Sequence, residues 1–224
     1  IDVLVNNAGV FDMSGSYSTT VDGFESHLGV NYLGQVLLTL LLLPAMASDG
    51  GGDSSAAPRI VMVSSKLHEL GRIDFDDYNL RARGSYSATR AYAQSKLAQI
   101  MFAKRLQKKL HLSPDGDGAI AIAVHPGNAM THVTRTLSPT IQALYRYLSF
   151  LLTPEEGARS TVYAATAPAS ALEGSLYLGQ ACTKCEPSRW LRDDEAVHRL
   201  WKLSLKLTLT DAERESVGRF VRLD

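Results

Sequence analysis

The sequence predicts an α/β protein in which a doubly wound parallel sheet carries helices on both faces, a three-layer αβα arrangement. Two observations predict it. Short runs that are apolar on both faces, as the strands of a covered parallel sheet are, alternate with longer runs of helical spacing. The chain has 224 residues, of which 45% are hydrophobic and 21% charged, enough for one globular domain with a substantial core.

The first half of the chain predicts two strands with a leucine-rich helix between them. Residues 2–5 form a short apolar run with β-branched side chains, which ends in an Asn-Asn-Ala-Gly turn. The spacing over residues 21–46 is helical, and Pro44 and the glycines at 50–52 end it. Residues 59–65 predict a second buried strand that finishes in two serines.

The second half repeats the alternation after a polar, irregular stretch over residues 66–90. The pattern predicts, in order, a helix over 91–112, a strand over 119–124, an apolar helix over 141–152, a helix from 154 to about 167, a strand over 175–179 and a helix over 193–207. Thr153 and Glu156 stand at the spacing of a capping box, with Pro154 in the first helical turn.

The charge balance and the cysteine count exclude several classes of protein. Lys plus Arg and Asp plus Glu both number 23, so the formal net charge is zero and nothing favours nucleic acid or an anionic membrane as a partner. Two cysteines are too few for a disulfide scaffold. The longest apolar run, residues 36–43, is far shorter than the roughly 18–20 residues of a membrane span.

Tyr92 and Lys96 form the pair with the most chemical meaning. Four residues apart on a helix, their side chains share one face. An ammonium near a phenol favours the phenolate and lowers the tyrosine pKa toward the neutral range, which makes a proton-transfer device. Taken alone, the pair is better explained as a solvated lysine beside a half-buried phenol, because such spacing arises readily by chance.

The positions of other polar residues add weight to the pair, since parallel sheets place their active sites at the carboxyl ends of the strands. The Asn-Asn-Ala-Gly turn, Ser64-Ser65 and the His125-Pro126-Gly127 turn each end a predicted strand. Asn31 lies in the helix between the first two strands. Separately, the asparagine turn fits an ordinary strand-ending turn equally well, and Pro126-Gly127 is better explained as a loop breaker.

Taken together, these residues resemble the short-chain dehydrogenase/reductase family and, in wording, its retinol-dehydrogenase branch. The family's motifs match Asn6-Asn7-Ala8-Gly9, Asn31, Ser65, Tyr92 with Lys96, and Pro126-Gly127 followed by Thr131. The five motifs occur in the expected order, and the likeness covers nearly the whole chain. The resemblance implies a Rossmann-type fold and hydride transfer between NAD(P) and an alcohol or carbonyl carbon.

The resemblance also implies a role for each residue. Tyr92 would exchange a proton with the substrate oxygen, Lys96 would lower its pKa and bind the nicotinamide ribose, and Ser65 would hold the substrate oxygen. Asn31 would anchor a water in a proton relay. Asn6, Ala8 and Gly9 would lie along the cofactor, and Pro126, Gly127 and Thr131 near the nicotinamide.

The branch favours NADP(H) over NAD(H) and a hydrophobic, retinoid- or polyprenoid-like alcohol, aldehyde or ketone as substrate. It implies an intracellular protein, cytoplasmic or associated with the endoplasmic reticulum, and is compatible with a homodimer. Membrane association would come only through a segment ahead of Ile1.

Several assignments remain open at the sequence level. Ser64 competes with Ser65 for the catalytic role. Residues 141–152 fit a core helix and an apolar lid over the substrate equally well. The spacing of Cys182 and Cys185 fits a structural turn better than a metal site, because no second cysteine pair accompanies it.

The chain lacks a glycine-rich phosphate loop after a strand, which such a fold places in its first βα turn. We therefore expect residues 1–224 to be the C-terminal part of a single Rossmann-type domain, from its fourth strand onward. Without the three preceding strands, residues 2–5 would be an unprotected apolar edge, and the fragment alone would neither fold stably nor bind cofactor. Two other functions stay open: a non-catalytic nucleotide-sensing or partner-binding module, and an inactive truncated product.

Overall fold

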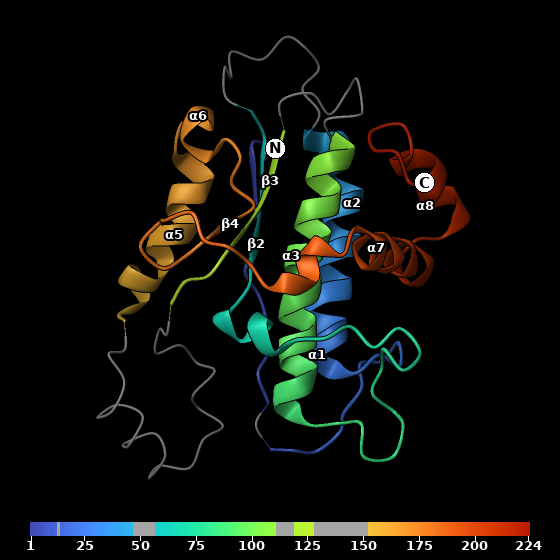
Figure 1. The fold of residues 1–224 in the computed structure, drawn as a ribbon. Helices are drawn as coiled ribbons and strands as arrows, with labels where there is room; N and C mark the ends of the chain where they lie inside the picture. Colours follow the sequence, from blue (N-terminus) through green and yellow to red (C-terminus); the bar gives the residue numbers. More distant parts are fainter. Residues whose placement is uncertain (13, 47–56, 111–118, 128–151) are drawn as a thin grey trace.

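The computed structural model describes residues 1–12, 14–46, 57–110, 119–127 and 152–224 (Figure 1). Its centre is a four-stranded sheet in the order β1-β2-β3-β4, with every neighbouring pair parallel. The strands are β1 (Val3–Asn6), β2 (Arg59–Val63), β3 (Ile120–Val124) and β4 (Tyr177–Leu178). The predicted parallel α/β sheet is thus confirmed. β4 is shorter than the sequence pattern predicts.

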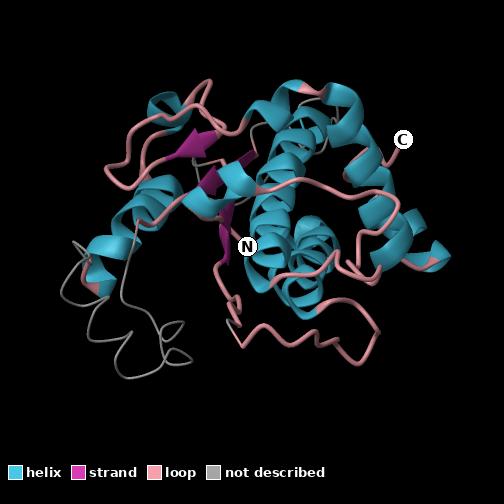
Figure 2. Ribbon diagram, turned by 60° about the horizontal axis from the view of Figure 1, so that its bottom comes forward, coloured by secondary structure: helices cyan, strands magenta, loops and turns pink. Residues whose placement is uncertain are grey.

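Helices cover both faces of the sheet, which confirms the three-layer arrangement. Figure 1 shows α5 (Pro154–Thr166) and α6 (Ala169–Leu172) on one side of the strands and α2 (Gly34–Met46) and α3 (Ala88–Leu110) on the other. Figure 2, turned by 60°, shows the strands enclosed in the same way. Because β2 and β3 lie between these layers, nearly all of their side chains are buried.

The edge strand β1 is less well covered. Val3 and Val5 are 39% and 38% exposed, although the inner strand β2 is buried throughout. β1 pairs with β2 on one side, and the described residues place no strand on its other side. This agrees with the expected apolar edge.

A continuous helical run, α1 (Ser26–Leu28), η1 (Gly29–Leu33) and α2, leads from β1 toward β2. By length and composition this run, Ser26–Met46, could cross a membrane: its mean hydropathy is 1.6, although no uninterrupted apolar stretch is that long. Half of it is buried inside the protein, with Val36 and Leu40 fully enclosed. The run is therefore a core helix in this structure, which extends two residues beyond Pro44.

The larger of two apolar cores lies between the sheet and the helices α2, α3 and α7 (Asp194–Thr208). The Phe102 ring on α3 stacks on the Trp201 ring on α7, with centroids 5.6 Å apart. Trp201 is only 1% exposed, and its indole N–H donates to the Leu223 carbonyl at 3.3 Å. The C-terminal segment thus completes the core over α2 and α3.

The smaller core lies beneath α5, on the other face of the sheet. Thr153 and Glu156 form the predicted capping box: the Glu156 N–H donates to Thr153 Oγ1 at 3.2 Å, and the Thr153 N–H donates to Glu156 Oε2 at 2.9 Å. At the other end of α5, the buried Arg59 guanidinium donates to the carbonyls of Ala164 and Ala167. A cation at this helix C-terminus satisfies carbonyls that the helix leaves unpaired.

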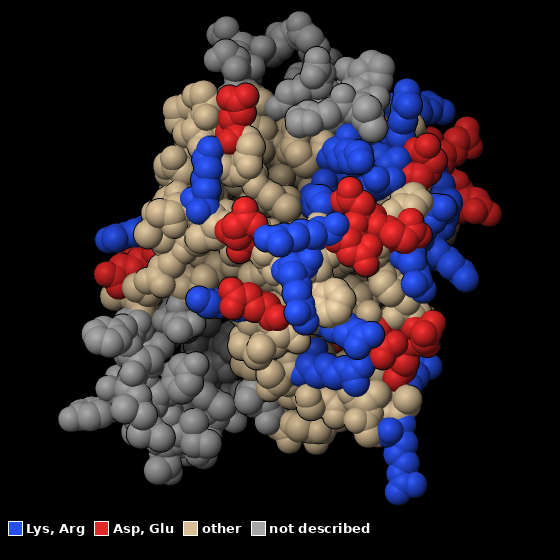
Figure 3. All heavy atoms as spheres, in the orientation of Figure 1, with Lys and Arg blue, Asp and Glu red and all other residues tan. Residues whose placement is uncertain are grey.

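The C-terminal region contains elements that the sequence pattern does not predict. These are α6, η5 (Arg189–Arg192) and α8 (Asp211–Val217). α8 is short but carries a capping box of its own, formed by Thr210 and Glu213. The face in Figure 3 intermingles blue and red side chains over this region, without a field of one sign. The predicted helix over 141–152 falls almost entirely outside the described residues.

The larger core gives a matched test of burial. Leu200 on α7 is 3% exposed, and Leu38 on α2 is 47% exposed. We expect Leu200→Ala to reduce the free energy of unfolding by about 2–5 kcal/mol, because it removes buried methyl groups and leaves a cavity. Leu38→Ala should cost less than about 1 kcal/mol. Urea unfolding of the purified variants measures both, and equal losses would contradict the described packing.

Candidate active site

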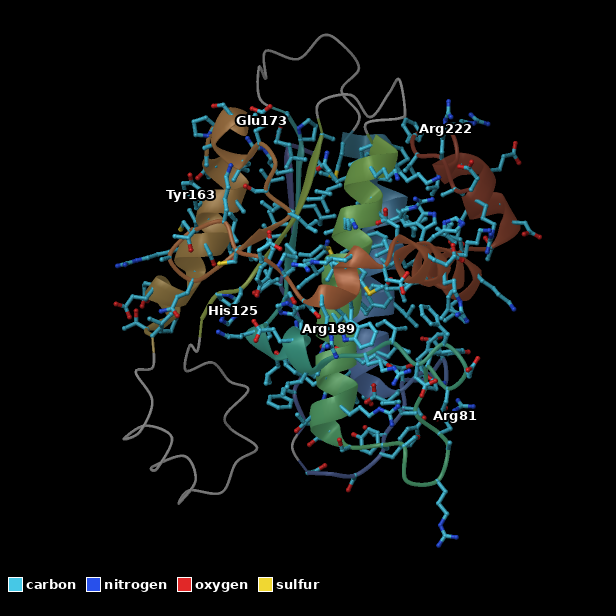
Figure 4. The ribbon with its side chains drawn as sticks, in the orientation of Figure 1. Arg81, His125, Tyr163, Glu173, Arg189 and Arg222 are labelled. Atoms are coloured by element: carbon cyan, nitrogen blue, oxygen red, sulfur yellow. The ribbon has the colours of Figure 1, made fainter. Side chains whose placement is uncertain are left out.

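The predicted site residues converge at the carboxyl edge of the sheet. Asn6 is the last residue of β1, Ser64 and Ser65 follow β2, and His125 follows β3. The first half of α3 passes this edge and carries Tyr92. Figure 4 shows the labelled His125 at the end of β3, beside η2 (Lys66–Leu70).

Tyr92 and Ser65 form the hydroxyl pair at the centre of the site. Both side chains are half-buried, and they lie close enough for Ser65 to act on the pKa of Tyr92. Burial raises the pKa of Tyr92, and the hydrogen bond with Ser65 lowers it by a smaller amount. The net shift of the Tyr92 pKa is upward here, because the cost of burying the phenolate is the larger effect, and the lowering of this pKa by Lys96 stays a prediction.

Lys96 is the buried cation of the site. Its side chain is 4% exposed, and Nζ donates to the Val63 carbonyl at 2.9 Å. Nζ also lies 5.5 Å from the centre of the Tyr92 ring. Burial penalises the ammonium and lowers the pKa of Lys96 to about 8. Lys96 therefore changes its charge near neutral pH much more readily than an exposed lysine.

The two neighbouring serines have different environments. Ser64 is 3% exposed, and its hydroxyl donates to the Lys96 carbonyl on α3 at 2.8 Å. Ser65 instead caps η2 by accepting the Leu67 N–H at 3.2 Å and presents its side chain to Tyr92. The structure thus gives Ser64 a purely structural contact and places Ser65 beside the phenol.

Asn31 lies inside the π-helical segment η1 and is fully buried. Its amide clamps the backbone of Val10: Oδ1 accepts the Val10 N–H at 2.7 Å, and Nδ2 donates to the Val10 carbonyl at 2.9 Å. Nδ2 also lies 3.1 Å from the Ser95 hydroxyl on α3. π-helical turns occur often at functional sites. Here the turn brings Asn31 between the β1 loop and the catalytic helix.

The Asn-Asn-Ala-Gly turn divides into a buried end and an open end. Asn6 is 3% exposed, and its Nδ2 donates to Thr39 Oγ1 at 2.9 Å. Its side chain therefore faces α2 rather than the open edge, which leaves only its backbone for any contact along a cofactor. Ala8 and Gly9 are exposed. The Ala8 carbonyl accepts Gln35 Nε2 at 2.6 Å, which fixes the open part of the turn.

Two glycines mark places where the backbone must approach closely. A Cβ on Gly9 would lie 3.0 Å from Asn31 Oδ1 and 3.7 Å from Lys96 Nζ. Gly127 has φ of +86°, and a Cβ there would lie 2.5 Å from Leu152 Cδ1. Pro126 precedes it at the end of β3. Thr131 lies outside the described residues.

Residues that the sequence reasoning did not assign also reach the site. The Phe11 ring stacks on Tyr92, with centroids 4.2 Å apart and an interplanar angle of 29°. The His27 ring meets Tyr92 edge-on at 6.0 Å. His68 lies beneath Ser65: its Nδ1 is 2.7 Å from the Ser65 carbonyl, and its Nε2 accepts the Ser188 N–H at 3.1 Å. His27 could have been found from the sequence, because it stands four residues before Asn31 and so on the same face of a helix.

The residues present fit a nicotinamide dinucleotide. In the described part of the chain, the Lys96 ammonium donates to Val63 alone, so further N–H donors of this buried cation stay free for ribose hydroxyls. Any side chain at Gly9 would fill the space beside Nζ and Asn31. Tyr92, Lys96 and the Gly9 backbone are thus the described residues best placed to hold the ribose end.

The free cysteines and a cavity of the described structure both lie apart from this site. Within the described ranges, no three His, Cys, Asp or Glu residues come together to hold a metal ion. Cys182 and Cys185 are free thiols in a tight turn, where the Cys182 N–H donates to the Gly179 carbonyl at 3.0 Å. A cavity of about 610 Å³ opens at the amino end of β3, opposite the catalytic edge. It is lined by Lys104, Ile120 and Leu172, among others.

The parallel sheet, together with the tyrosine, lysine, serine and asparagine at its carboxyl edge, defines a Rossmann-type α/β domain with a polar site at that edge. Residues 1–79 match the family model of the short chain dehydrogenases. The chain is similar to members of the short-chain dehydrogenase/reductase family and, among them, to the retinol-dehydrogenase branch.

Curated relatives of Mus musculus support the family assignment. The chain is 42% identical over 210 residues to polyprenol dehydrogenase, a match that covers 93% of this chain and 60% of that protein. It is 41% identical over 208 residues to retinol dehydrogenase 11, and this match covers 92% of this chain and 61% of that protein. The chain thus spans about three fifths of the length of these relatives.

Solved structures agree on the fold. A crystal structure of an uncharacterized protein from Mycobacterium Paratuberculosis is 37% identical, with a TM-score of 0.64, and the match covers 92% of this chain and 66% of that one. The angucycline C-6 ketoreductase LanV with bound NADP is 20% identical, with a TM-score of 0.51, and the match covers 80% of this chain and 61% of that one. The second similarity concerns the fold alone.

The lowered pKa of Lys96 predicts a pH dependence of stability. Unfolded Lys96 titrates near 10.4, so between pH 8 and that value the unfolded state binds more protons than the folded one. The burial penalty is complete below pH 8 and is relieved as the pH rises. We expect Lys96 to add on the order of 1 kcal/mol to the unfolding free energy between pH 8 and 9. The unfolding free energies of wild type and Lys96→Met, measured with urea, should diverge by this amount over this pH range. Parallel pH dependences of the two proteins would contradict the prediction.

Proposed function

We propose that this chain carries the catalytic residues of an NAD(P)-dependent oxidoreductase that transfers a hydride between nicotinamide and a hydrophobic alcohol or carbonyl carbon. The observation that carries the proposal is the geometry of Tyr92. Its ring lies 5.5 Å from the Lys96 ammonium, Ser65 lies close enough to lower its pKa, and all three stand at the carboxyl edge of a parallel sheet.

Each catalytic residue has a distinct part in this proposal. Tyr92 is the acid or base that gives a proton to, or takes one from, the substrate oxygen, and Ser65 donates a hydrogen bond to the same oxygen. The Lys96 ammonium stabilises the phenolate as it forms. Asn31 holds the Val10 backbone and, through a water, would extend the proton path.

A bound nicotinamide dinucleotide supplies the hydride or accepts it. Lys96 and Tyr92 would bind its ribose, and the open turn at Ala8 and Gly9, with the Asn6 backbone, would lie along it. Pro126, Gly127 and Thr131 would stand near the nicotinamide ring. We propose NADP(H) over NAD(H); LanV has NADP bound in its crystal structure.

The substrate we propose is an apolar, retinoid- or polyprenoid-like alcohol, aldehyde or ketone. Support comes from the printed activities of the relatives, a polyprenol dehydrogenase and several retinol dehydrogenases. Phe11 adds an aromatic surface directly beside the Tyr92 ring, which suits an apolar carbon next to the reacting oxygen.

The role of the phenol is tested by Tyr92→Phe, which removes the exchangeable proton and keeps the ring. We expect turnover to fall by at least about a hundredfold, the usual contribution of a general acid or base, while the cofactor dissociation constant changes less than about threefold. The matched control is Tyr86→Phe, whose hydroxyl donates to the Ser16 carbonyl at the surface. Steady-state kinetics and cofactor titration of the complete protein measure the two quantities. Unchanged turnover in Tyr92→Phe would reject the catalytic assignment.

The two serines allow a paired experiment. We expect Ser65→Ala to lower turnover about a hundredfold, because it removes a hydrogen bond to the substrate oxygen. Ser64→Ala should instead reduce the unfolding free energy by about 1 kcal/mol, because it removes the buried hydrogen bond from Ser64 to the Lys96 carbonyl. Kinetics and urea unfolding of both variants make the comparison. A larger loss of turnover in Ser64→Ala would reverse the assignment.

A further inference from the structure

Glu25 and His27 form a buried pair that the catalytic scheme does not use. Each side chain is 1% exposed, and Glu25 Oε1 lies 2.7 Å from His27 Nδ1. The second carboxylate oxygen accepts the Leu28 N–H at 2.8 Å. Burying such a pair costs desolvation free energy, and packed apolar side chains would stabilise the fold as well. The hydrogen bonds that the pair makes are therefore the best guide to its function.

The contacts of His27 determine its tautomer. Nε2 accepts the backbone N–H of Asp12 at 3.1 Å, so this nitrogen carries a lone pair and no proton. The ring proton is then on Nδ1, where it is donated to Glu25. The carboxylate thus orients the imidazole so that its other nitrogen holds the Asp12 backbone, much as a carboxylate orients a metal-binding histidine.

The segment after the asparagine turn is consequently held at two points. Asn31 binds both backbone groups of Val10, and His27 binds the backbone N–H of Asp12. His27 and Asn31 are four residues apart in one helical run, so both side chains leave the same face. Phe11, between the two anchored residues, has its ring at 4.2 Å from the Tyr92 ring.

We propose that the Glu25–His27 pair is a positioning device, which fixes Phe11 against Tyr92 and thereby sets the orientation of the catalytic phenol. The inference rests on the proposed function of Tyr92. Phe11 lies nearly parallel to the phenol, His27 meets it edge-on at 84°, and the Lys96 ammonium lies 5.5 Å from its centre. Contacts on these sides hold the ring in one orientation, with its hydroxyl at Ser65.

The first experiment separates the hydrogen-bonding role of His27 from its bulk. Glu25→Gln is used as the background, so that no unpaired buried carboxylate remains. In this background His27→Gln keeps an acceptor for the Asp12 N–H, and His27→Phe keeps the ring and removes the acceptor. We expect His27→Phe to lower kcat about tenfold, with KM for the cofactor unchanged, and His27→Gln to retain most of kcat. The reverse order would overturn the proposal. His198→Phe on α7 is the remote control and should keep wild-type turnover.

The second experiment acts on Phe11 directly and leaves the buried pair intact. Phe11→Leu should lower kcat about tenfold, and Phe11→Tyr, which keeps the stacked ring, should lower it less. Combined with His27→Phe in the Glu25→Gln background, Phe11→Leu should add little further loss, because both changes remove the same contact. Wild-type kcat in Phe11→Leu, or fully additive losses, would contradict the proposal.

A third readout does not depend on turnover. A stacked phenyl ring shifts the NMR signals of the ring protons above and below it, so the Tyr92 ring signals, assigned through Tyr92→Phe, report the stacking. We expect them to move in Phe11→Leu and in the His27→Phe variant and to keep their positions in the His27→Gln variant. Unmoved signals would reject the positioning role. If Tyr92→Phe leaves turnover intact, the proposed function fails, and these signals still decide the positioning.

Discussion

A reciprocal pair of hydrogen bonds between β2 and α3 is the constraint on which the site depends. The Ser64 hydroxyl donates to the Lys96 carbonyl, and the Lys96 ammonium donates to the Val63 carbonyl. Since Ser65 directly follows Ser64 and Tyr92 lies one turn before Lys96, these two bonds set the separation of the Ser65 and Tyr92 side chains. Burying an ammonium with so few hydrogen-bond partners costs free energy. Its place beside the Tyr92 phenol, where it can act on the ionisation of that group, gives a reason for this cost.

The second constraint is the path of the chain after β1. The π-helical turn η1 directs Asn31 toward the segment that leaves the asparagine turn, and its amide satisfies both backbone groups of Val10. Gly9 lies so close to Asn31 that a side chain there would displace the amide or Lys96. The open turn, the π-helical segment and the catalytic helix therefore form one packed unit, in which a change in any member moves the others.

Much of this arrangement could be predicted from the sequence, because the relevant signals are local. Apolar runs gave the parallel strands, and Thr153 with Glu156 gave the start of α5. The direction of the Tyr92 pKa was not predictable in this way, since it depends on how deeply the ring is buried by Phe11 and its neighbours. α8 was missed because its seven residues show too short a pattern, and its contacts with α2 are long-range.

Burial acts on Tyr92 and Lys96 in opposite directions, and this links their proton equilibria. It raises the pKa of the phenol and lowers that of the ammonium, so each charged form is costly by itself. A phenolate beside an ammonium has no net charge, so the ionisation of Tyr92 becomes easier when Lys96 keeps its proton. Because Phe11 adds to the burial of the phenol, the residues that hold Phe11 in place also act on the pKa of Tyr92.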